Sequence, residues 1–204
     1  MLESIKQCKR CNLCNNQNPL LDNKRTCDVM WVGLSAKKVD NIEEEIPLSE
    51  DTNTGSVIAE IESRCTGVKT YKTNLVKCLP LDENNKLRYP NSKEIKCCFN
   101  NLIKEVEMLN PKIIFLLGSQ VTTAVQKNLK IEFIKERDSD LKTAQYNSIE
   151  FVAVYHPSYV CSYRRKYKDT YIEQISNFIN NKLKTGENNF CEIFVQINKN
   201  ISKL

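Results

Sequence analysis

The chain has 204 residues, of which 41% are hydrophobic and 27% charged, and this balance excludes a disordered protein. The formal net charge of +5 permits a phosphate-rich partner without requiring one. No apolar run is long enough to span a membrane, and residues 1–6 lack the apolar stretch of a signal peptide, so we expect a cytoplasmic protein without membrane contact.

The N-terminal segment, residues 1–27, is rich in cysteine. The whole chain has 10 cysteines, and in a reducing compartment this number favours metal or cluster ligands over disulfides. Cys8 and Cys11 form a CxxC pair, which brings two thiolates onto one tight turn. Zinc sites and redox sites share this spacing, so the pair alone does not choose between them.

Apolar runs predict strands and helices in alternation along the chain. The expected strands are continuous apolar or β-branched runs at residues 28–33, 71–78, 112–118 and 149–155. Apolar residues at helical spacing predict helices at residues 54–63, 92–110, 119–129 and 167–183. Residues 130–148 are ambiguous, and residues 190–197 predict an edge strand within an otherwise uninformative tail, residues 186–204.

This alternation predicts the fold class α/β, as one domain over residues 1–204. We expect a three-layer α/β/α sandwich with a short, mainly parallel central sheet. Ligands bind at the carboxyl ends of the strands in such sheets. Three predicted strands end near Gly33, Asn74 and His156, so we expect these residues to converge on one rim.

Several motifs follow one another in an order that is quite specific. They are Cys8-x-x-Cys11-x-Leu, Thr73-Asn-Leu-Val-Lys-Cys78-x-Pro80, Glu94-Ile-x-x-Cys98, a strand ending at Gly118, and His156-Pro-Ser158. Through these motifs, residues 8 to 180 resemble the uracil-DNA glycosylase superfamily, in particular its iron–sulfur families 4 and 5. The family fold is an α/β/α sandwich, which agrees with the independent interpretation above.

The resemblance implies a four-iron four-sulfur cluster that ties the N-terminal segment to the core. By motif its ligands fall on Cys8, Cys11, Cys78 and Cys98, with Cys97 as an alternative to Cys98. Four thiolates also suit zinc, which stays open as the alternative. The remaining cysteines, for which we expect structural roles, are Cys14, Cys27, Cys65, Cys161 and Cys191.

The resemblance also implies the catalytic residues. His156, the only histidine, would donate a hydrogen bond to O2 of the leaving base as negative charge builds there. Asn74 would read the base, because its amide can accept from uracil N3–H and donate to O4. Without the resemblance, a histidine at a strand end or an asparagine in a turn would be read as structural.

The chain departs from the family at the loop after the first strand. Gly33, Leu34, Ser35, Ala36 and Lys37 stand where family 4 has Gly-Glu-Ala-Pro-Gly, and the sequence is closer to the Gly-Leu-Ala-Pro-Ala of family 5. Ser35 occupies the position of a water-activating aspartate.

Other departures concern the base. If a carboxylate activates water, Asp40 is the nearest candidate in sequence. Leu48 replaces the phenylalanine on which family 4 stacks the base. Lys37 replaces a small residue, so the lysine side chain could narrow or recharge the pocket. We therefore expect Gly33, Leu34, Ala36, Lys37 and Leu48 to line the base pocket with Asn74.

A basic segment follows the histidine, where the family places the loop that probes the DNA helix. Its arginines would contact phosphates and its tyrosines could enter the base stack. The expected DNA-binding residues are Ser158, Tyr159, Tyr163, Arg164 and Arg165.

The sequence thus predicts a monofunctional hydrolase of base excision repair. It would be a monomer that acts on single- or double-stranded DNA and releases uracil or a related deaminated base. Two alternatives remain: a glycosylase for a modified, phage-type pyrimidine, and a cluster-containing DNA-binding protein without catalysis. The missing activating carboxylate favours the second alternative, whereas the presence of both Asn74 and His156 opposes it.

Overall fold

A computed structural model describes the backbone of residues 2–24, 26–137 and 139–201, and side chains as far as residue 184. A six-stranded sheet runs through the molecule in the order β2-β1-β3-β6-β5-β4. The first four strands in this order run parallel to one another, β5 is antiparallel to β6, and β4 is antiparallel to β5. The strands are β1 (Val29–Ser35), β2 (Thr70–Val76), β3 (Ile113–Leu117), β4 (Ile134–Lys135), β5 (Lys142–Tyr146) and β6 (Ile149–Val154).

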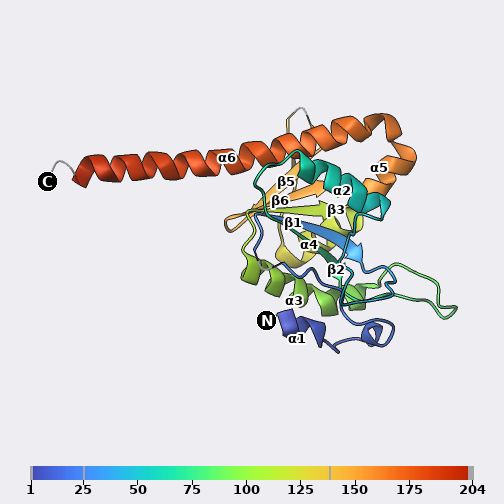
Figure 1. The fold of residues 1–204 in the computed structure, drawn as a ribbon. Helices are drawn as coiled ribbons and strands as arrows, with labels where there is room; N and C mark the ends of the chain where they lie inside the picture. Colours follow the sequence, from blue (N-terminus) through green and yellow to red (C-terminus); the bar gives the residue numbers. More distant parts are fainter. Residues whose placement is uncertain (1, 25, 138, 202–204) are drawn as a thin grey trace.

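Helices cover both faces of the sheet, which confirms the predicted three-layer sandwich (Figure 1). On one face lie α2 (Asn53–Ser63), α5 (Pro157–Tyr163) and α6 (Lys168–Ile201). On the other lie α3 (Ser92–Leu109) and α4 (Ser119–Leu129), with α1 (Leu2–Lys6) outside α3. Single turns form η1 (Asn12–Asn15) and η2 (Arg165–Tyr167).

The core consists of two apolar layers, one on each face of the parallel strands. All five residues of β3 are buried, as a continuous apolar run in a central parallel strand predicts. Trp31 of β1 stacks on Phe115 of β3 with ring centroids 4.5 Å apart. The indole N–H of Trp31 donates to Glu62 at 2.9 Å, so this buried polar group is satisfied.

The two helices that flank the rim of the sheet begin at well-capped residues. Thr52 accepts a hydrogen bond from the backbone N–H of Gly55 at the start of α2. Asn91 and Glu94 form a reciprocal capping box at the start of α3. The box fixes where α3 begins, and thereby places Cys97 and Cys98 in its first two turns.

The outer edge of β2 is covered by the segment that follows the cysteine-rich turn. The backbone N–H of Leu20 donates to the carbonyl oxygen of Lys77 at 2.9 Å. The backbone N–H of Lys72 donates to the buried Asp22 carboxylate at 3.0 Å. Since β2 is the last strand of the sheet, these bonds occupy backbone groups that an edge strand otherwise exposes.

The structure differs from the sequence prediction in three places. The ambiguous residues 130–148 contain β4 and β5, and the short helix α5 was not predicted. The predicted edge strand at residues 190–197 is wrong, because α6 continues to Ile201. The apolar residues of that run also recur every three or four positions, which is the helical period. Among the described residues, no helix has the length and apolar character to cross a membrane.

Candidate functional site

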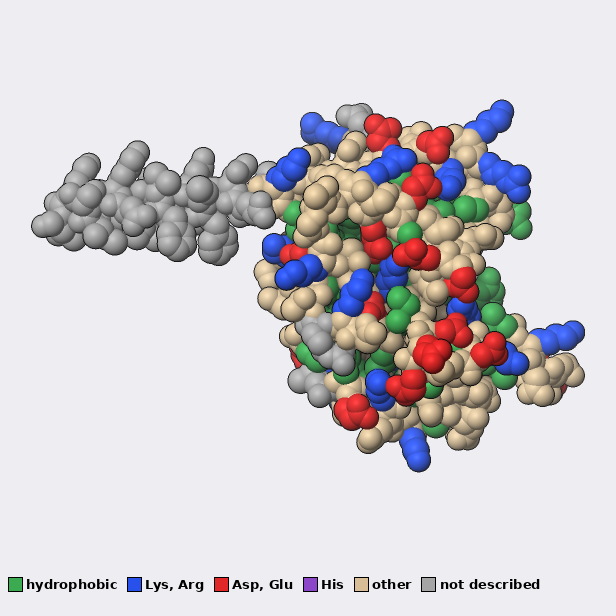
Figure 2. Space-filling view, in the orientation of Figure 1, with side chains coloured by type: hydrophobic (Ala, Val, Ile, Leu, Met, Phe, Trp, Pro, Cys, Tyr) green, Lys and Arg blue, Asp and Glu red, His purple; other side chains and the backbone are tan. Residues whose placement is uncertain are grey.

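A large cavity opens where the carboxyl ends of β1, β2, β3 and β6 meet, as predicted. Gly33 and Asn74 are register partners in β1 and β2, and His156 follows β6 by two residues. All three residues line this one cavity. The surface is notched between α5 and the loop that follows β2 (Figure 2).

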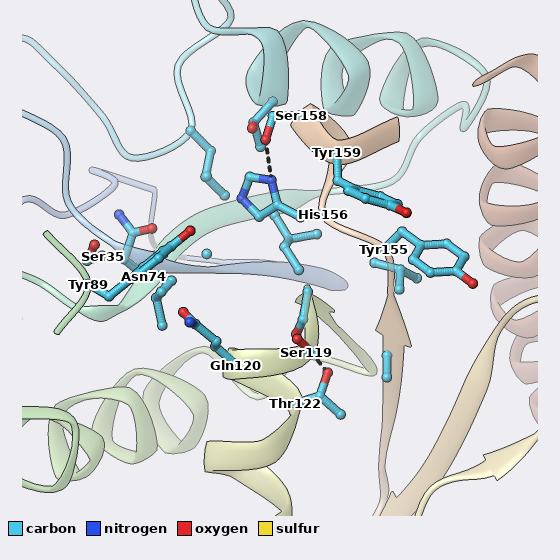
Figure 3. Close-up of a pocket in the computed structure, with 18 of the residues that line it drawn as sticks. Ser35, Asn74, Tyr89, Ser119, Gln120, Thr122, Tyr155, His156, Ser158 and Tyr159 are labelled. Atoms are coloured by element: carbon cyan, nitrogen blue, oxygen red, sulfur yellow. Dashed lines mark hydrogen bonds between the residues drawn. The ribbon is translucent and has the colours of Figure 1, made fainter. Parts of the chain in front are cut away.

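Asn74 presents an unpaired amide to the cavity. The residue is only 3% exposed, yet none of its described contacts is a hydrogen bond to the side-chain amide. Within the described part of the chain, no fully buried side-chain N or O atom lacks a partner. The amide of Asn74 must therefore reach the open space of the cavity (Figure 3). An unpaired donor and acceptor at the bottom of a cavity are suited to read a polar ligand edge.

Gly33 is required by the position of Asn74. A Cβ atom added at Gly33 would lie 2.4 Å from Oδ1 of Asn74 and 3.0 Å from a methyl carbon of Leu48. Leu48 itself has a φ of 54°, in the left-handed region that a branched side chain rarely adopts. This backbone turns Leu48 toward Gly33, and both residues line the cavity as predicted.

His156 stands at the start of α5, opposite Asn74 across the cavity (Figure 3). Its Nδ1 lies 2.8 Å from Oγ of Ser158. Burial lowers the pKa of His156, so the neutral imidazole is favoured at pH 7. When Ser158 donates to Nδ1, the proton of the neutral ring is on Nε2, on the other side of the ring.

The end of β1 and the loop after it contribute several of the residues that the sequence predicts. Leu34, Ser35 and Lys37 line the cavity, whereas Ala36 is 1% exposed and is not among the lining residues. The ammonium of Lys37 pairs with Asp51 at 3.0 Å and with Glu45 at 3.6 Å. Its charge is therefore largely compensated by residues of its own loop region.

Carboxylates are nearly absent from the cavity wall. Asp40 is exposed and does not line the cavity. Among the described residues, the only carboxylate on the wall is Asp140, which pairs with Arg164 at 3.7 Å. Ser35, the last residue of β1, and Lys37 are the polar side chains of this segment that line the cavity.

The predicted DNA-binding residues lie along α5 and the turn after it. Ser158, Tyr159 and Tyr163 line the cavity, while Arg164 and Arg165 do not. The guanidinium of Arg164 is 4.8 Å from the ring centre of Tyr155 and 4.5 Å from that of Tyr167, so it also has a packing role. Arg165 is exposed, and its Nε donates to the carbonyl oxygen of Cys161.

A second, small hollow is ringed by cysteines. It is lined by Cys8, Cys11, Cys78, Cys97 and Cys98, which come from the N-terminal segment, the end of β2 and α3. Asn101 donates from Nδ2 to the sulfur of Cys8 at 3.4 Å, and the backbone N–H of Lys77 donates to Cys98 at 3.4 Å. These N–H groups suit thiolates better than thiols.

The chemistry of these sulfurs fits a positively charged group between them. Burial, and then repulsion from the neighbouring Cys98 and Cys11, raises the pKa of the Cys78 thiol. Such thiols ionise only when a cation or metal centre compensates the charge. In the described part of the chain, no three His, Cys, Asp or Glu side chains are arranged to hold a single metal ion.

The cysteines without a predicted ligand role have varied surroundings. Cys27 and Cys65 are buried in the two core layers, and Cys161 packs against one of them. Cys14 belongs to the cysteine cluster, where its thiol donates to the carbonyl oxygen of Cys11 at 3.2 Å. The side chain of Cys191 lies outside the described residues.

Many of the lining residues were not predicted from the sequence, including three with large polar or aromatic side chains. Tyr89 comes from the loop after β2, Gln120 from the start of α4, and Tyr155 from the residue before His156 (Figure 3). The sequence offered a clue to two of them, because Tyr155 lies at the end of a predicted strand and Tyr89 lies between the motifs that contain Cys78 and Cys98. Arg88 and Glu94 pair at 2.6 Å and hold the loop that carries Tyr89.

Comparisons with known proteins identify the family of this chain. The model of the uracil DNA glycosylase superfamily matches residues 16–180. The chain is 25% identical over 170 residues to a type-4 uracil-DNA glycosylase of Thermotoga maritima, covering 78% of this chain and 80% of the relative. It is 25% identical over 181 residues to one of Archaeoglobus fulgidus, covering 84% and 86%.

A solved structure shares the fold. The crystal structure of wild-type SMUG2 from Pedobacter heparinus superposes with a TM-score of 0.54 at 16% sequence identity. The match covers 82% of this chain and 79% of that one. At this identity the likeness concerns the fold alone.

Proposed function

Because the chain belongs to the uracil DNA glycosylase superfamily, we propose that it hydrolyses the N-glycosidic bond of uracil, or of a related deaminated base, in DNA. One observation carries the proposal: the nearly buried Asn74 keeps an unpaired amide in the cavity that also holds His156. In the free protein water can satisfy this amide, and a ligand edge with matching donor and acceptor can take the place of that water. Two curated relatives are type-4 uracil-DNA glycosylases, which supports uracil as the base.

Asn74 reads the base. A carboxamide can accept from N3–H of uracil and donate to O4, whereas cytosine presents the opposite pattern. With cytosine the amide would face donor against donor and acceptor against acceptor once the base fills the cavity. Such mismatches cost several kcal/mol, roughly a factor of 10⁴ in selectivity.

His156 stabilises the leaving base. Bond cleavage moves negative charge onto the base and leaves a cation-like sugar. The neutral ring, held by Ser158 through Nδ1, donates from Nε2 to O2 of the base as the charge builds. A neutral donor is consistent with the lowered pKa of His156.

Ser35 positions the water that attacks the sugar. Among the described residues, the only carboxylate on the cavity wall is Asp140, which pairs with Arg164, so the loop after β1 offers no carboxylate to the cavity. Ser35 and the backbone of this loop can orient a water molecule but cannot take its proton strongly. We therefore expect slow turnover, with most of the rate enhancement coming from the donor at the leaving base.

A four-iron four-sulfur cluster fits the cysteine ring. Cys8, Cys11, Cys78 and Cys98 would hold it, with Asn101 and the backbone of Lys77 donating to the sulfurs. When bound, the cluster supplies no step of the hydrolysis and ties residues 8–11 to β2 and α3. We assign the protein to the cytoplasm, where thiols stay reduced.

The DNA approaches over α5. Ser158, Tyr159 and Tyr163 line the cavity mouth, and Arg164 and Arg165 follow them. A target base has to leave the helix, or come from a single strand, to reach Asn74. The arginines would contact phosphates on either side of it.

Base release from defined oligonucleotides tests the proposal. Wild-type protein should produce alkali-labile sites in uracil-containing DNA, and His156→Ala should slow this by about 100-fold or more while DNA affinity stays nearly unchanged. Unchanged base release in that variant would refute the role of His156.

The same experiment separates the alternatives when hypoxanthine, xanthine and 5-hydroxymethyluracil are included. Leu48, in place of an aromatic ring, is the feature that would favour a larger pyrimidine. Activity on such a base with none on uracil would shift the assignment to a modified pyrimidine. Silence on every base, with DNA still bound, would indicate a DNA-binding protein without catalysis.

A further inference from the structure

Three tyrosines form a row that leads out of the cavity. The rings of Tyr155 and Tyr159 have centroids 6.0 Å apart, and those of Tyr159 and Tyr163 are 5.4 Å apart. The interplanar angles are 31° and 32°. Tyr159 and Tyr163 have i, i+4 spacing on one side of the short helix α5, and Tyr155 precedes this helix by two residues. Figure 3 shows Tyr155 and Tyr159 beside each other, on the far side of His156 from Asn74.

The row is an exposed apolar surface rather than part of the core. Tyr155, Tyr159 and Tyr163 are 40%, 45% and 79% exposed. Among the described residues, the large exposed hydrophobic side chains that line the cavity are these three together with Leu87 and Tyr89. Exposed apolar side chains that gather around one cavity mark a binding surface.

We propose that Tyr155, Tyr159 and Tyr163 form a stacking platform for single-stranded DNA next to the base pocket. Neighbouring ring centres are farther apart than the rise of about 3.4 Å per nucleotide in each strand of B-DNA. Their spacing therefore suits bases that have been drawn apart in an extended strand. Paired and stacked bases of a duplex do not offer their faces to such a row, whereas unpaired bases do.

Basic residues beside the row suit the backbone of the same strand. Arg165 and Lys166 follow Tyr163, and no described ion pair joins either of them to a carboxylate. Arg164 lies over the ring of Tyr155 at 4.8 Å and also pairs with Asp140, so it mainly holds the first ring of the row in place. Lysine and arginine side chains project from the surface over this end of the molecule (Figure 2).

This proposal rests on the proposed function only in taking DNA as the ligand. It goes further because it specifies that the bound DNA is single-stranded. A strand whose bases stack on Tyr159 and Tyr163 runs past Tyr155 directly to His156. The base at the end of the row then lies at the mouth of the cavity. The protein therefore prefers single-stranded over double-stranded DNA.

Fluorescence anisotropy with uracil-free DNA tests the platform independently of catalysis. The probes are a labelled oligothymidylate and a labelled duplex of equal length, at one stated salt concentration. The single strand should bind more tightly to the wild type. Tyr159→Ala and Tyr163→Ala should each weaken single-strand binding by about fivefold or more, and the duplex much less. Tyr163→Phe keeps a ring and should bind like the wild type.

A matched control removes an exposed tyrosine elsewhere. Tyr146, in β5, is 38% exposed and does not line the cavity, so Tyr146→Ala should leave single-strand affinity unchanged. Equal losses for single strand and duplex in Tyr159→Ala and Tyr163→Ala, or no loss in either, would overturn the platform. Loss of single-strand binding in these variants supports it even if the wild type releases no base, so the two proposals fail separately.

Discussion

The side chain of Asn74 rests against the bare α-carbon of Gly33, so closely that a methyl group there would come within 2.4 Å of Oδ1. The contact joins two strands that are neighbours in the sheet but are separated by the whole of α2 in the sequence. Gly33 therefore fixes where the proposed base reader stands.

Gly33→Ala should displace Asn74 and slow base release by roughly 100-fold, because a displacement of about 1 Å can have that effect. Single-turnover kinetics on a uracil-containing oligonucleotide measure it. Gly67→Ala is the control: Gly67 has a φ of 76° with open space around it, so the variant loses stability through backbone strain alone. Base release by Gly33→Ala at the rate of Gly67→Ala would contradict the positioning role.

Lys77 and Glu105 are both fully buried and form an ion pair at the end of β2, the strand that carries Asn74. Lys77 also donates to the carbonyl oxygen of Asn74 at 2.5 Å and to Oγ1 of Thr73 at 2.7 Å. Lys77→Met should lower the free energy of unfolding by about 3–5 kcal/mol, since it leaves a buried carboxylate without its partner. Urea denaturation measures the change.

The double variant Lys77→Met/Glu105→Gln should recover much of that loss. It removes the unpaired charge and keeps an acceptor for the hydroxyl of Tyr71, which donates to Glu105 at 2.9 Å. If the double variant is no more stable than Lys77→Met, the loss does not come from an unpaired charge.

The partly buried His156 predicts the acid side of the pH profile. Burial lowers its pKa from the ordinary value of about 6.5, so the neutral ring persists to lower pH than in a free histidine. Base release should thus stay level from pH 8 down to about 6.5 and fall at lower pH, as the imidazolium replaces the neutral donor. His156→Gln should lack this fall, and an inflection above about 6.5 in the wild type would contradict the assignment.

Cys97 and Cys98 can be distinguished by elemental analysis. Cys98 is 7% exposed and receives the backbone N–H of Lys77, so Cys98→Ser should lower the iron content and the visible absorbance of the purified protein. Cys97→Ser should retain both. Zinc in place of iron in the wild type would show that the cluster assignment is wrong. Loss of iron in Cys97→Ser but not in Cys98→Ser would show that Cys97, rather than Cys98, is the ligand.

Most of the sheet and the meeting of Gly33, Asn74 and His156 could be predicted, because buried parallel strands are continuous apolar runs with functional residues at their ends. The β4–β5 pair could not, since both residues of β4 are exposed and carry no apolar alternation. The short α5 has too few residues for a helical period to emerge.

The pairing of side chains could not be predicted from the sequence, for a different reason. Lys37 was expected to narrow or recharge the pocket, and its ion pairs with Asp51 and Glu45 could not be foreseen, because only the fold of the loop brings these partners to it. Tyr89 likewise reaches the cavity through a loop whose path depends on the pairing of Arg88 with Glu94. Such contacts depend on three-dimensional geometry rather than on any periodic pattern.

The hydrogen bonds that join Leu20 and Asp22 to the outer edge of β2 affect the solubility of the protein. Without them, β2 would present a row of free amides and carbonyls, and two copies of the sheet could join edge to edge. A shortened chain that starts after residue 27 should therefore precipitate or form mixed oligomers at concentrations where the longer chain stays dispersed. The cysteine-rich segment therefore also prevents self-association through the edge of the sheet.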